Sequence, residues 1–418
     1  MSRNFRIFLS ATVVFWAVGS MNDATAMYVL AGVCIAVMLV AYLLAQLSLS
    51  RLELTMTPPH GRANAGAPVH PRVHVRSRGG ITVGSAAVEL AAENLTVEGV
   101  RVARRVLLPP MPPAAELDLD LEMVPPARGR YLLSAPALID SDPIGMFERG
   151  RRQGEPFELV VFPRTWDLPR VAAWEVGYGR RSARGRQARR DQGEFRGIRE
   201  HTPGDDLRHV HWKVTAHVGE LAVKEYEPLR HDLISVHLDL AASGHYGSGP
   251  MSTLETAISA AASIARAGLA EQRSVSVVGD GLPTEVARPG SGQPHLHRIM
   301  VGLAEARALS THSFASMLSR QLRAVPRGAT VFVITTAAED ALARVLSSGA
   351  AHVESLTLLV VEGDLEGAPE HFAVVPRRVT EAAMAAGIAV APLRSGADII
   401  EALTLATAPA RSAAAEVL

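Results

Sequence analysis

Two apolar runs at the start of the sequence constrain the fold of this chain most. Ala24 to Leu49 exceeds the roughly 20 residues that a helix needs to cross a bilayer, and only Asn22 and Asp23 separate it from the run before it. That first run, Ile7 to Met21, is short for a full span. It reaches an adequate length only if Phe5 joins it and the side chain of Arg6 extends toward the lipid headgroups.

The arginines around these runs predict how they are oriented. Arg3 and Arg6 precede them and Arg51 follows them, whereas the turn between them has no Lys or Arg. The positive-inside rule therefore predicts a multi-pass anchor in the inner (plasma) membrane over residues 1–50, with the bulk of the chain in the cytosol. A cleaved signal peptide is the competing interpretation. We favour the hairpin because a second long apolar run follows at once and no small-residue cleavage site is convincing.

Length and charge narrow the class of protein. A chain of 418 residues is too long for one compact core, so two or three domains are expected. Lys plus Arg and Asp plus Glu number 42 each, so no whole-protein field attracts nucleic acid. The one cysteine, Cys34, has no second cysteine with which to form an internal disulfide.

Residues 51–165 have the pattern of a small antiparallel β-sandwich. Leu117 to Met123 alternates strictly between apolar and acidic residues, which is typical of a strand with one buried face. Clusters of Pro and Gly separate this strand from others. Those other predicted strands are Val73–Val75, Ala87–Leu90, Val100–Leu108, Tyr131–Ser134 and Phe157–Phe162. Two short motifs in this region, Arg128 to Tyr131 and Asp142 to Phe147, are interpreted as turns and strand edges.

Residues 166–230 hold a basic loop and then a charged segment. The loop carries six arginines without a hydrophobic period, which predicts a solvated loop. Contact with anionic lipid or with an acidic partner surface is the alternative. Nucleic acid is not expected, because no aromatic residues are interspersed to stack on bases. The six are Arg180, Arg181, Arg184, Arg186, Arg189 and Arg190.

Residues 231–410 alternate apolar strands with helices. Leu233 to Leu240, Thr330 to Thr335 and Ser355 to Val361 are nearly continuous apolar runs. Such runs between helices are typical of a parallel sheet that is covered on both faces. The fold class predicted for the whole chain is therefore two transmembrane helices, a β-sandwich and an α/β doubly wound domain.

The segment from Gly193 to Pro228 links the two predicted domains. Thr202 to Gly204 predicts a turn, because proline fixes one φ and glycine accepts the positive φ of a type II turn. Asp205 follows as the expected N-cap of a short helix that runs to His211. The alternation from Glu220 to Tyr226 predicts a strand.

Charges of both signs in this segment predict a network of ion pairs at the junction between the sandwich and the α/β half. We expect Trp212 to be largely buried there. The expected members of the network are Arg199, Asp206, Arg208, Lys213, Glu194 and Glu225.

The same segment resembles the signature of the domain-of-unknown-function family fifty-eight (DUF58). His201 and His217 depart from the family pattern, which usually has Tyr and Arg there. The resemblance implies a von Willebrand factor A-like α/β domain and a partnership with MoxR-type AAA+ ATPases. The matching residues, which we take as interaction residues, are Glu194, Phe195, Arg199, Glu200, Pro203, Gly204, Asp205, Asp206, Arg208, His211, Trp212 and Lys213.

A von Willebrand A domain can hold a divalent cation through Asp-x-Ser-x-Ser after its first strand. Asp239 and Ser243 fit that pattern here, but Ala241 replaces the first serine. Magnesium requires near-octahedral oxygen ligands, so the loss of a hydroxyl weakens the site. The sequence therefore predicts no cofactor, with a degenerate magnesium site at Asp239 as the alternative.

The sequence has no catalytic or zinc-binding motif that would support an enzyme. His201, His209, His211 and His217 lie close in sequence, but neither Cys₂His₂ nor His-Glu-x-x-His spacing is present. A structural role for His211 is preferred to metal ligation. We therefore expect no catalytic residue and predict a non-enzymatic, membrane-anchored adaptor or chaperone-type component. The alternatives are a metal-assisted hydrolase or nuclease built on the charged segment, and a cation-dependent adhesion module.

Overall fold

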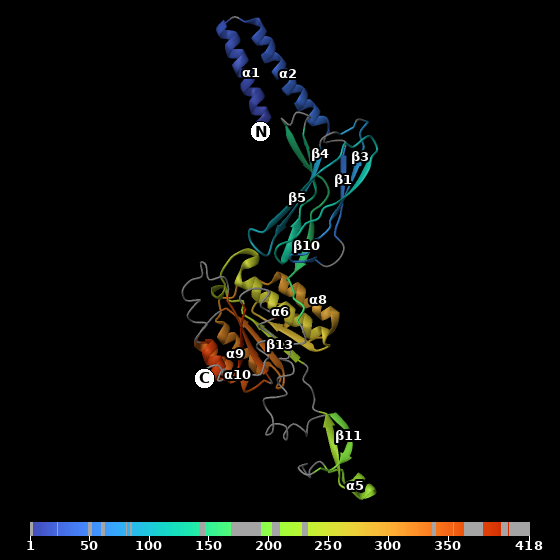
Figure 1. Ribbon diagram of the computed structural model, residues 1–418, viewed down its shortest axis with the longest axis vertical. Helices are drawn as coiled ribbons and strands as arrows, with labels where there is room; N and C mark the ends of the chain where they lie inside the picture. The colour runs from blue at the N-terminus through green and yellow to red at the C-terminus, as the bar shows by residue number, and fades with distance from the viewer. Residues whose placement is uncertain are drawn as a thin grey trace, which may run out of the picture. The chain divides into compact units, whose positions relative to one another are not determined.

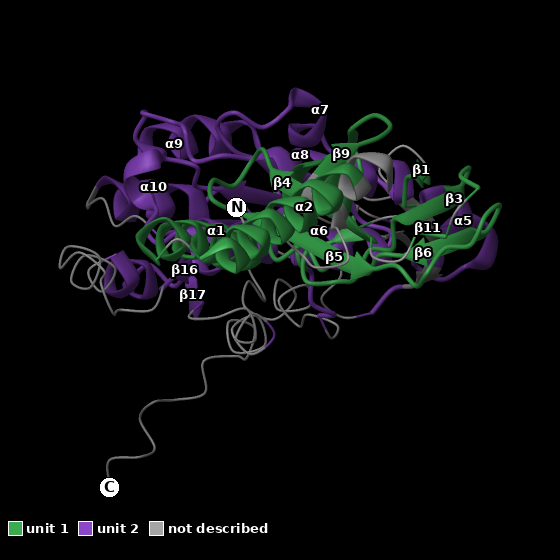
Figure 2. Ribbon diagram, turned by 90° about the horizontal axis from the view of Figure 1, so that it is seen from above, with its two compact units in different colours: residues 1–164 green, residues 165–418 purple. Residues whose placement is uncertain are grey.

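The computed structural model describes residues 3–22, 24–48, 52–59, 63–80, 82–83, 86–141, 147–168, 194–202, 210–227, 233–336, 340–353, 355–362, 379–393 and 400. The chain divides into two compact units, Met1–Arg164 and Thr165–Leu418, which are coloured separately in Figure 2. Each unit has its own hydrophobic core, so each is described by itself.

Unit 1 begins with two helices, α1 (Arg3–Asn22) and α2 (Thr25–Ser48), which pack along each other (Figure 1). Asn4–Asn22 and Thr25–Leu43 are long and apolar enough to cross a membrane. Only 6% and 11% of these two windows is buried within the protein, so they are unlike the core helices of a soluble domain. Large apolar side chains such as Val13 and Val29 are more than half exposed.

The rest of unit 1 consists of two β-sheets. A three-stranded antiparallel sheet has the order β1 (Leu52–Thr57), β3 (Arg72–Ser77), β6 (Glu116–Asp120). A seven-stranded sheet follows the path β2 (Ala63–Asn64), β10 (Phe157–Phe162), β7 (Gly129–Leu133), β4 (Ala86–Asn94), β8 (Ala137–Ser141), β9 (Glu148–Arg152). In addition, β5 (Arg101–Leu107) pairs with the other edge of β4.

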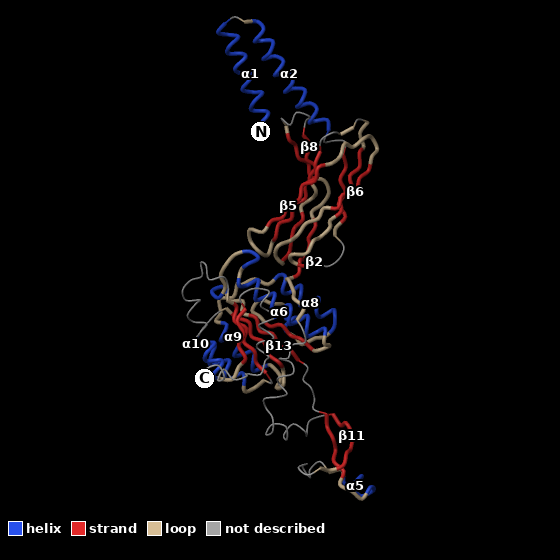
Figure 3. The backbone as a smooth tube through the Cα atoms, in the orientation of Figure 1, coloured by secondary structure: helices blue, strands red, loops and turns tan. Residues whose placement is uncertain are grey.

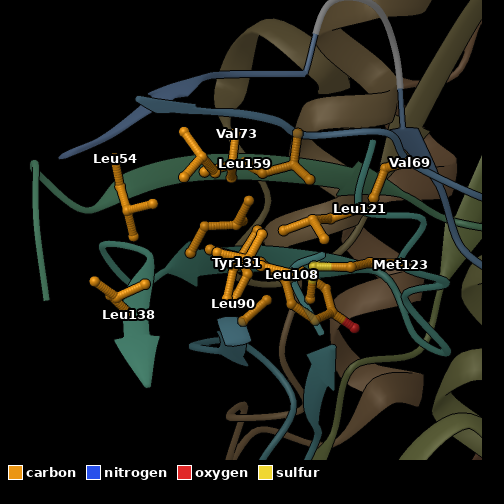
Figure 4. Packing of buried hydrophobic residues seen from close by; sticks show 14 of the residues in the cluster. Leu54, Val69, Val73, Leu90, Leu108, Leu121, Met123, Tyr131, Leu138 and Leu159 are labelled. Atoms are coloured by element: carbon orange, nitrogen blue, oxygen red, sulfur yellow. The ribbon is translucent and has the colours of Figure 1, made fainter. Parts of the chain in front are cut away.

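One hydrophobic core lies between the two sheets, which makes unit 1 a β-sandwich. Figure 4 shows Val73 of β3 and Leu121 packed with Leu90, Tyr131 and Leu159 of the larger sheet. Burial of each such side chain contributes about 1.5–3 kcal/mol. The alternation predicted for residues 117–123 is confirmed in β6, whose pattern of exposure alternates.

Arg128 to Tyr131, one of the two short motifs, forms a corner of this sandwich. Gly129 has φ +133°, and a Cβ there would meet Oδ1 of Asn94 at 2.6 Å. The Asn94 amide donates to the Arg128 carbonyl oxygen at 2.9 Å, and the Tyr131 hydroxyl donates to the Ala127 carbonyl oxygen at 2.8 Å. The interpretation as turn chemistry is confirmed for this motif. Most of the other, residues 142–146, lies outside the described residues.

Unit 2 contains a five-stranded parallel sheet, drawn in Figure 3. Its order is β14 (Ser274–Val278), β13 (Leu233–Leu238), β15 (Thr330–Thr335), β16 (Ser355–Val361), β17 (Ala389–Leu393). All neighbouring strands pair in parallel, as the apolar runs predict. β13 and β15 are fully buried along their length because neighbouring strands flank them and helices cover them.

The helices of unit 2 form two groups. α6 (Thr253–Ala270) packs on β13 and β14 and contacts α8 (Gly292–Glu305), which also contacts the short α7 (Thr284–Ala287). α9 (Phe314–Ala324) and α10 (Asp340–Ala350) pack together, and α10 contacts β16. Two 3₁₀ turns, η3 (Ala242–Gly244) and η4 (Gly249–Met251), precede α6, and residues 379–385 are helical.

Some predictions fall outside the described residues. These include the arginine-rich loop of residues 180–190, and all but one residue of the helix expected over 397–405. Strands β1, β8 and β9 were not predicted from the sequence.

Candidate functional site

The signature segment folds as a separate β-α-β hairpin. β11 (Glu194–Glu200) and β12 (Ala222–Glu227) pair antiparallel and form their own two-stranded sheet. Phe195 faces Tyr226 and Arg199 faces Val223, with a β-bulge between Phe195 and Gly197. The pairing brings the first and last parts of the signature together at the base of the hairpin.

A two-turn helix, α5 (Trp212–Val218), lies between these strands in the sequence. His211 caps it, since its Nδ1 accepts a 3.3 Å hydrogen bond from the Val214 backbone N–H. Gly219 ends the helix with φ +82°, and its N–H donates to the Thr215 carbonyl oxygen. The Thr215 hydroxyl in turn accepts from the Ala222 N–H at 3.1 Å, which ties α5 to β12.

The prediction that Trp212 is buried is wrong, because its exposed fraction is 67%. The helix begins at Trp212 and contains no buried residue, so the indole has no core to enter. The small apolar centre of the hairpin is instead made by Val210, Ala222 and Val223. Three further apolar side chains of the hairpin are exposed, namely Val218 at 63%, Leu221 at 40% and Ile198 at 39%.

The other signature residues divide into three groups. Glu194, Phe195, Arg199 and Glu200 are placed as backbone positions of β11. Lys213 is exposed on α5 beside Trp212. Pro203, Gly204, Asp205, Asp206 and Arg208 lie outside the described residues, and with them the predicted turn, the predicted cap and the ion pairs of Asp206 and Arg208. The prediction of a helix that runs to His211 is wrong at that end, because Val210 forms a β-bridge to Val223 and His211 precedes α5 as its cap.

The second candidate site lies at the carboxyl end of the parallel sheet. Asp239 directly follows β13 and is fully buried. Its Oδ1 accepts a 3.0 Å hydrogen bond from the Ala241 N–H, and its Oδ2 accepts a 2.7 Å bond from the Thr335 hydroxyl. Ser243, the other predicted metal ligand, is exposed in η3.

This end of β13 is where the sheet changes winding direction. The strand that follows β13 in sequence lies on one side of it, and β15 lies on the other. Ligands of open α/β sheets bind in the crevice that such a reversal creates. Asp239 and Thr335 meet at that position. Among the described residues, no group of three or more His, Cys, Asp or Glu side chains forms a metal site.

A neighbouring cluster at the same edge was missed by the sequence analysis. Asp280 follows β14, and its Oδ2 accepts a 2.5 Å hydrogen bond from the Ser310 hydroxyl and lies 3.3 Å from His312 Nδ1. The hydrogen bond from Ser310 lowers the pKa of Asp280 below its ordinary value, and His312 adds to that effect. The signal was present, since an acidic residue lies two positions after the strand that ends at Val278.

The geometry of this cluster does not match an activated nucleophile. A catalytic serine donates its proton to a base such as histidine, whereas Ser310 donates to the Asp280 carboxylate. Its backbone also joins the Asp239 loop, since the Ala242 N–H donates to the Ser310 carbonyl oxygen at 2.9 Å. The cluster therefore holds two loops together at the sheet edge.

Unit 2 thus defines an α/β protein with a five-stranded parallel sheet and a separate β-α-β hairpin before its first strand. The family model described as "Protein of unknown function DUF58" matches residues 197–374, which run from β11 to beyond β16. No curated protein matches the chain.

Several solved structures are similar to part of the chain. The CARDB domain of the PF1109 protein from Pyrococcus furiosus is 19% identical, with a TM-score of 0.19, over 27% of this chain and 94% of that one. A cohesin module from a Clostridium perfringens family 33 glycoside hydrolase is 12% identical, with a TM-score of 0.18, over 27% and 96%. Spo0M, a sporulation control protein from Bacillus subtilis, is 11% identical, with a TM-score of 0.18, over 36% and 58%.

Proposed function

We propose that this protein is a membrane-anchored, non-enzymatic adaptor that binds a protein partner through the β11–α5–β12 hairpin. The observation that carries the proposal is the exposure of Trp212 and Val218 on a helix with no buried residue. Large apolar surface that a protein leaves exposed marks interaction sites. Tryptophan is among the residues most enriched at the energetic centres of protein interfaces.

The partner we propose is a MoxR-type AAA+ ATPase. This choice rests on what the resemblance of the signature to DUF58 implies, and the family match over residues 197–374 supports the resemblance. Lys213 and Glu220 are exposed next in sequence to Trp212 and near Val218, so the hairpin offers exposed apolar and charged side chains together. That combination is typical of specific protein interfaces.

The parallel sheet supports the proposal that unit 2 is von Willebrand factor A-like. In that assignment, Asp239 stands where a metal-binding domain has its first ligand. Its carboxylate already accepts hydrogen bonds from Ala241 and Thr335 on its two oxygens. We propose that these hydrogen bonds, rather than a magnesium ion, hold this edge of the sheet.

The two N-terminal helices serve as the anchor in this proposal. Arg6 lies at one end of α1, and the described residues of the α1–α2 turn contain no Lys or Arg, which supports a hairpin with both ends on the cytosolic side. A cytosolic ATPase would then reach the adaptor from the same compartment.

Photo-crosslinking in intact cells tests the proposal. A photoreactive phenylalanine analogue replaces Trp212, and the matched control carries it at Leu309, which is 73% exposed in the same unit. After gentle solubilisation of membranes, we expect an AAA+ ATPase to be crosslinked from position 212 and not from 309. Equal crosslinking from both positions, or none from 212, contradicts the proposal.

A further inference from the structure

One end of the β-sandwich contacts the base of the helical pair. The ring of Phe147, just before β9, lies 5.4 Å from the ring of Phe5 and 5.7 Å from that of Tyr42, edge-on to both. α2 also contacts β8, as Figure 3 shows. Phe5 and Tyr42 lie at the same end of the two apolar windows, Asn4–Asn22 and Thr25–Leu43. Aromatic rings at such positions are typical of the membrane–water interface.

The strand register shows which other residues lie at this end. Gly150 of β9 pairs with Ile139 of β8, and Ile139 pairs with Ala87 of β4. Ala87 pairs on its other side with Leu107 of β5, so Leu107 lies level with Gly150 across the sheet. Leu107 is 77% exposed. A lipid surface beside this end would remove that large apolar side chain from water, which is favourable.

Exposed arginines lie toward this end of the sandwich, where β8 and β9 also carry Asp140 and Glu148. Arg151 and Arg152 of β9 are exposed, as is Arg6 of α1, and none of the three has an ion-pair partner among the described side chains. Residues of an extended strand are about 3.3 Å apart, so Arg151 follows Phe147 by roughly 13 Å. The long side chain of Arg151 must therefore extend back toward the interface, where the attraction of an anionic surface acts over about 8–10 Å.

Side-chain hydrogen bonds hold β9 in this position. Gln153 Nε2 donates to the Leu52 carbonyl oxygen at 2.9 Å, and Gln153 Oε1 accepts from the Leu54 N–H at 3.0 Å. These bonds join the end of β9 to β1, the first strand after the helical pair. β9 is therefore fixed at both ends to elements beside the anchor.

We propose that this end of the sandwich is a lipid-binding surface, in which Phe147 and Leu107 contact the interface and Arg6, Arg151 and Arg152 bind anionic phospholipid headgroups. The inference rests on the proposed anchoring by α1 and α2. It assigns unit 1 a role that the proposed adaptor function leaves open, namely to fix the sandwich against the bilayer.

Site-directed fluorescence quenching of the full chain in nanodiscs tests the inference. Cys34, the one cysteine, is replaced by Ser, and a single cysteine at Gly150 carries the fluorophore. A Cβ at Gly150 meets no atom within 4 Å, so the label has room. The matched control is Glu98→Cys, which is exposed in the turn beyond the opposite end of β4. Val14→Cys, within α1, reports on the anchor.

The quenchers are nitroxides on the headgroup of phosphatidylglycerol or of phosphatidylcholine, with an acyl-chain nitroxide for Val14. We expect several-fold stronger quenching at position 150 than at 98. We also expect a preference for phosphatidylglycerol of about fivefold per arginine, which falls to the share of Arg6 alone in Arg151→Gln/Arg152→Gln.

Three results would overturn the inference in different ways. Quenching at Val14 with equal quenching at 150 and 98 would retain the anchor and reject the lipid-binding surface. No quenching at Val14 would reject the anchor itself, and the inference with it. Equal quenching by phosphatidylglycerol and phosphatidylcholine, in the wild type and in the Gln variant alike, would mean that the arginines do not bind anionic lipid. They would then only protect an edge strand from pairing with other chains.

Discussion

The hydroxyl of Thr335 donates a 2.7 Å hydrogen bond to Asp239 Oδ2 and joins the carboxyl ends of the two strands β13 and β15. Both residues are buried, and Asp239 Oδ1 is bonded to the Ala241 N–H. Both carboxylate oxygens of Asp239 therefore accept hydrogen bonds from groups of the protein itself. The arrangement therefore leads to a specific expectation for metal binding.

We expect millimolar magnesium to change the melting temperature of the purified protein very little. A bound ion at one hundred times its dissociation constant would stabilise the fold by about 2.7 kcal/mol. Thermal unfolding with magnesium and with a chelator measures the difference. A clear rise with magnesium that disappears in Asp239→Ala would show that the site binds metal despite Ala241.

The corner at Gly129 yields a stability prediction for the sandwich. Gly129→Ala adds a Cβ that meets Asn94 Oδ1 at 2.6 Å and places a non-glycine residue at φ +133°. We expect the free energy of unfolding to fall by about 1–3 kcal/mol from the backbone strain alone. Gly150→Ala is the matched control, since its Cβ meets no atom within 4 Å. Equal denaturant midpoints for the two variants would contradict the assigned role of this corner.

A buried histidine predicts how stability depends on pH. His237 lies in β13 between Ser235 and Gln321, with its Nδ1 2.8 Å from Gln321 Oε1. Burial lowers the pKa of His237 from 6.5 to about 4, although the hydrogen bond to Gln321 opposes the shift. Between these two values the unfolded chain binds the proton and the folded protein does not, so stability is lost as the pH falls.

We expect the wild-type protein to lose up to about 3 kcal/mol more stability between pH 6.5 and pH 4 than His237→Gln does. The comparison removes the contributions of the other titrating groups, which the two proteins share. His217→Gln, at an exposed histidine, should instead follow the wild-type curve. Parallel curves for all three proteins would contradict the buried, neutral state of His237.

The orientation of the anchor gives a fourth prediction. A reporter that is active only in the cytosol, fused after Leu418, should be active, because Arg3, Arg6 and Arg51 flank two apolar runs whose turn has no Lys or Arg. Activity of a periplasmic reporter at the same position would favour the signal-peptide interpretation.

The sequence predicted the parallel sheet well because its strands are buried on both faces. A continuous apolar run such as Thr330–Thr335 is stable as a strand only where both of its faces are buried, as they are in a covered parallel sheet. Strand β9 was missed for the opposite reason, since Glu148–Arg152 is charged and lies at a sheet edge. Its pairing with β8 depends on register, which local composition does not encode.

The candidate sites were predicted less completely than the fold. Asp239 was identified because it follows an apolar strand within a recognisable spacing. Its bond to Thr335 joins residues 96 positions apart, and such contacts require the sheet order. Trp212 was predicted to be buried because its side chain is large and apolar. It is exposed because no residue of α5 packs into a core, and the sequence alone does not show this.

The central proposal is that the hairpin binds a AAA+ ATPase through Trp212. The most direct measurement is the affinity of the purified ATPase for the full chain in nanodiscs, for wild type, Trp212→Ala and the exposed control Leu309→Ala. We expect Trp212→Ala to lower the affinity by at least about 2 kcal/mol, or roughly thirtyfold, without a change in melting temperature. Leu309→Ala should bind as the wild type does. Unchanged affinity of Trp212→Ala, or a loss that accompanies unfolding, would contradict the proposal.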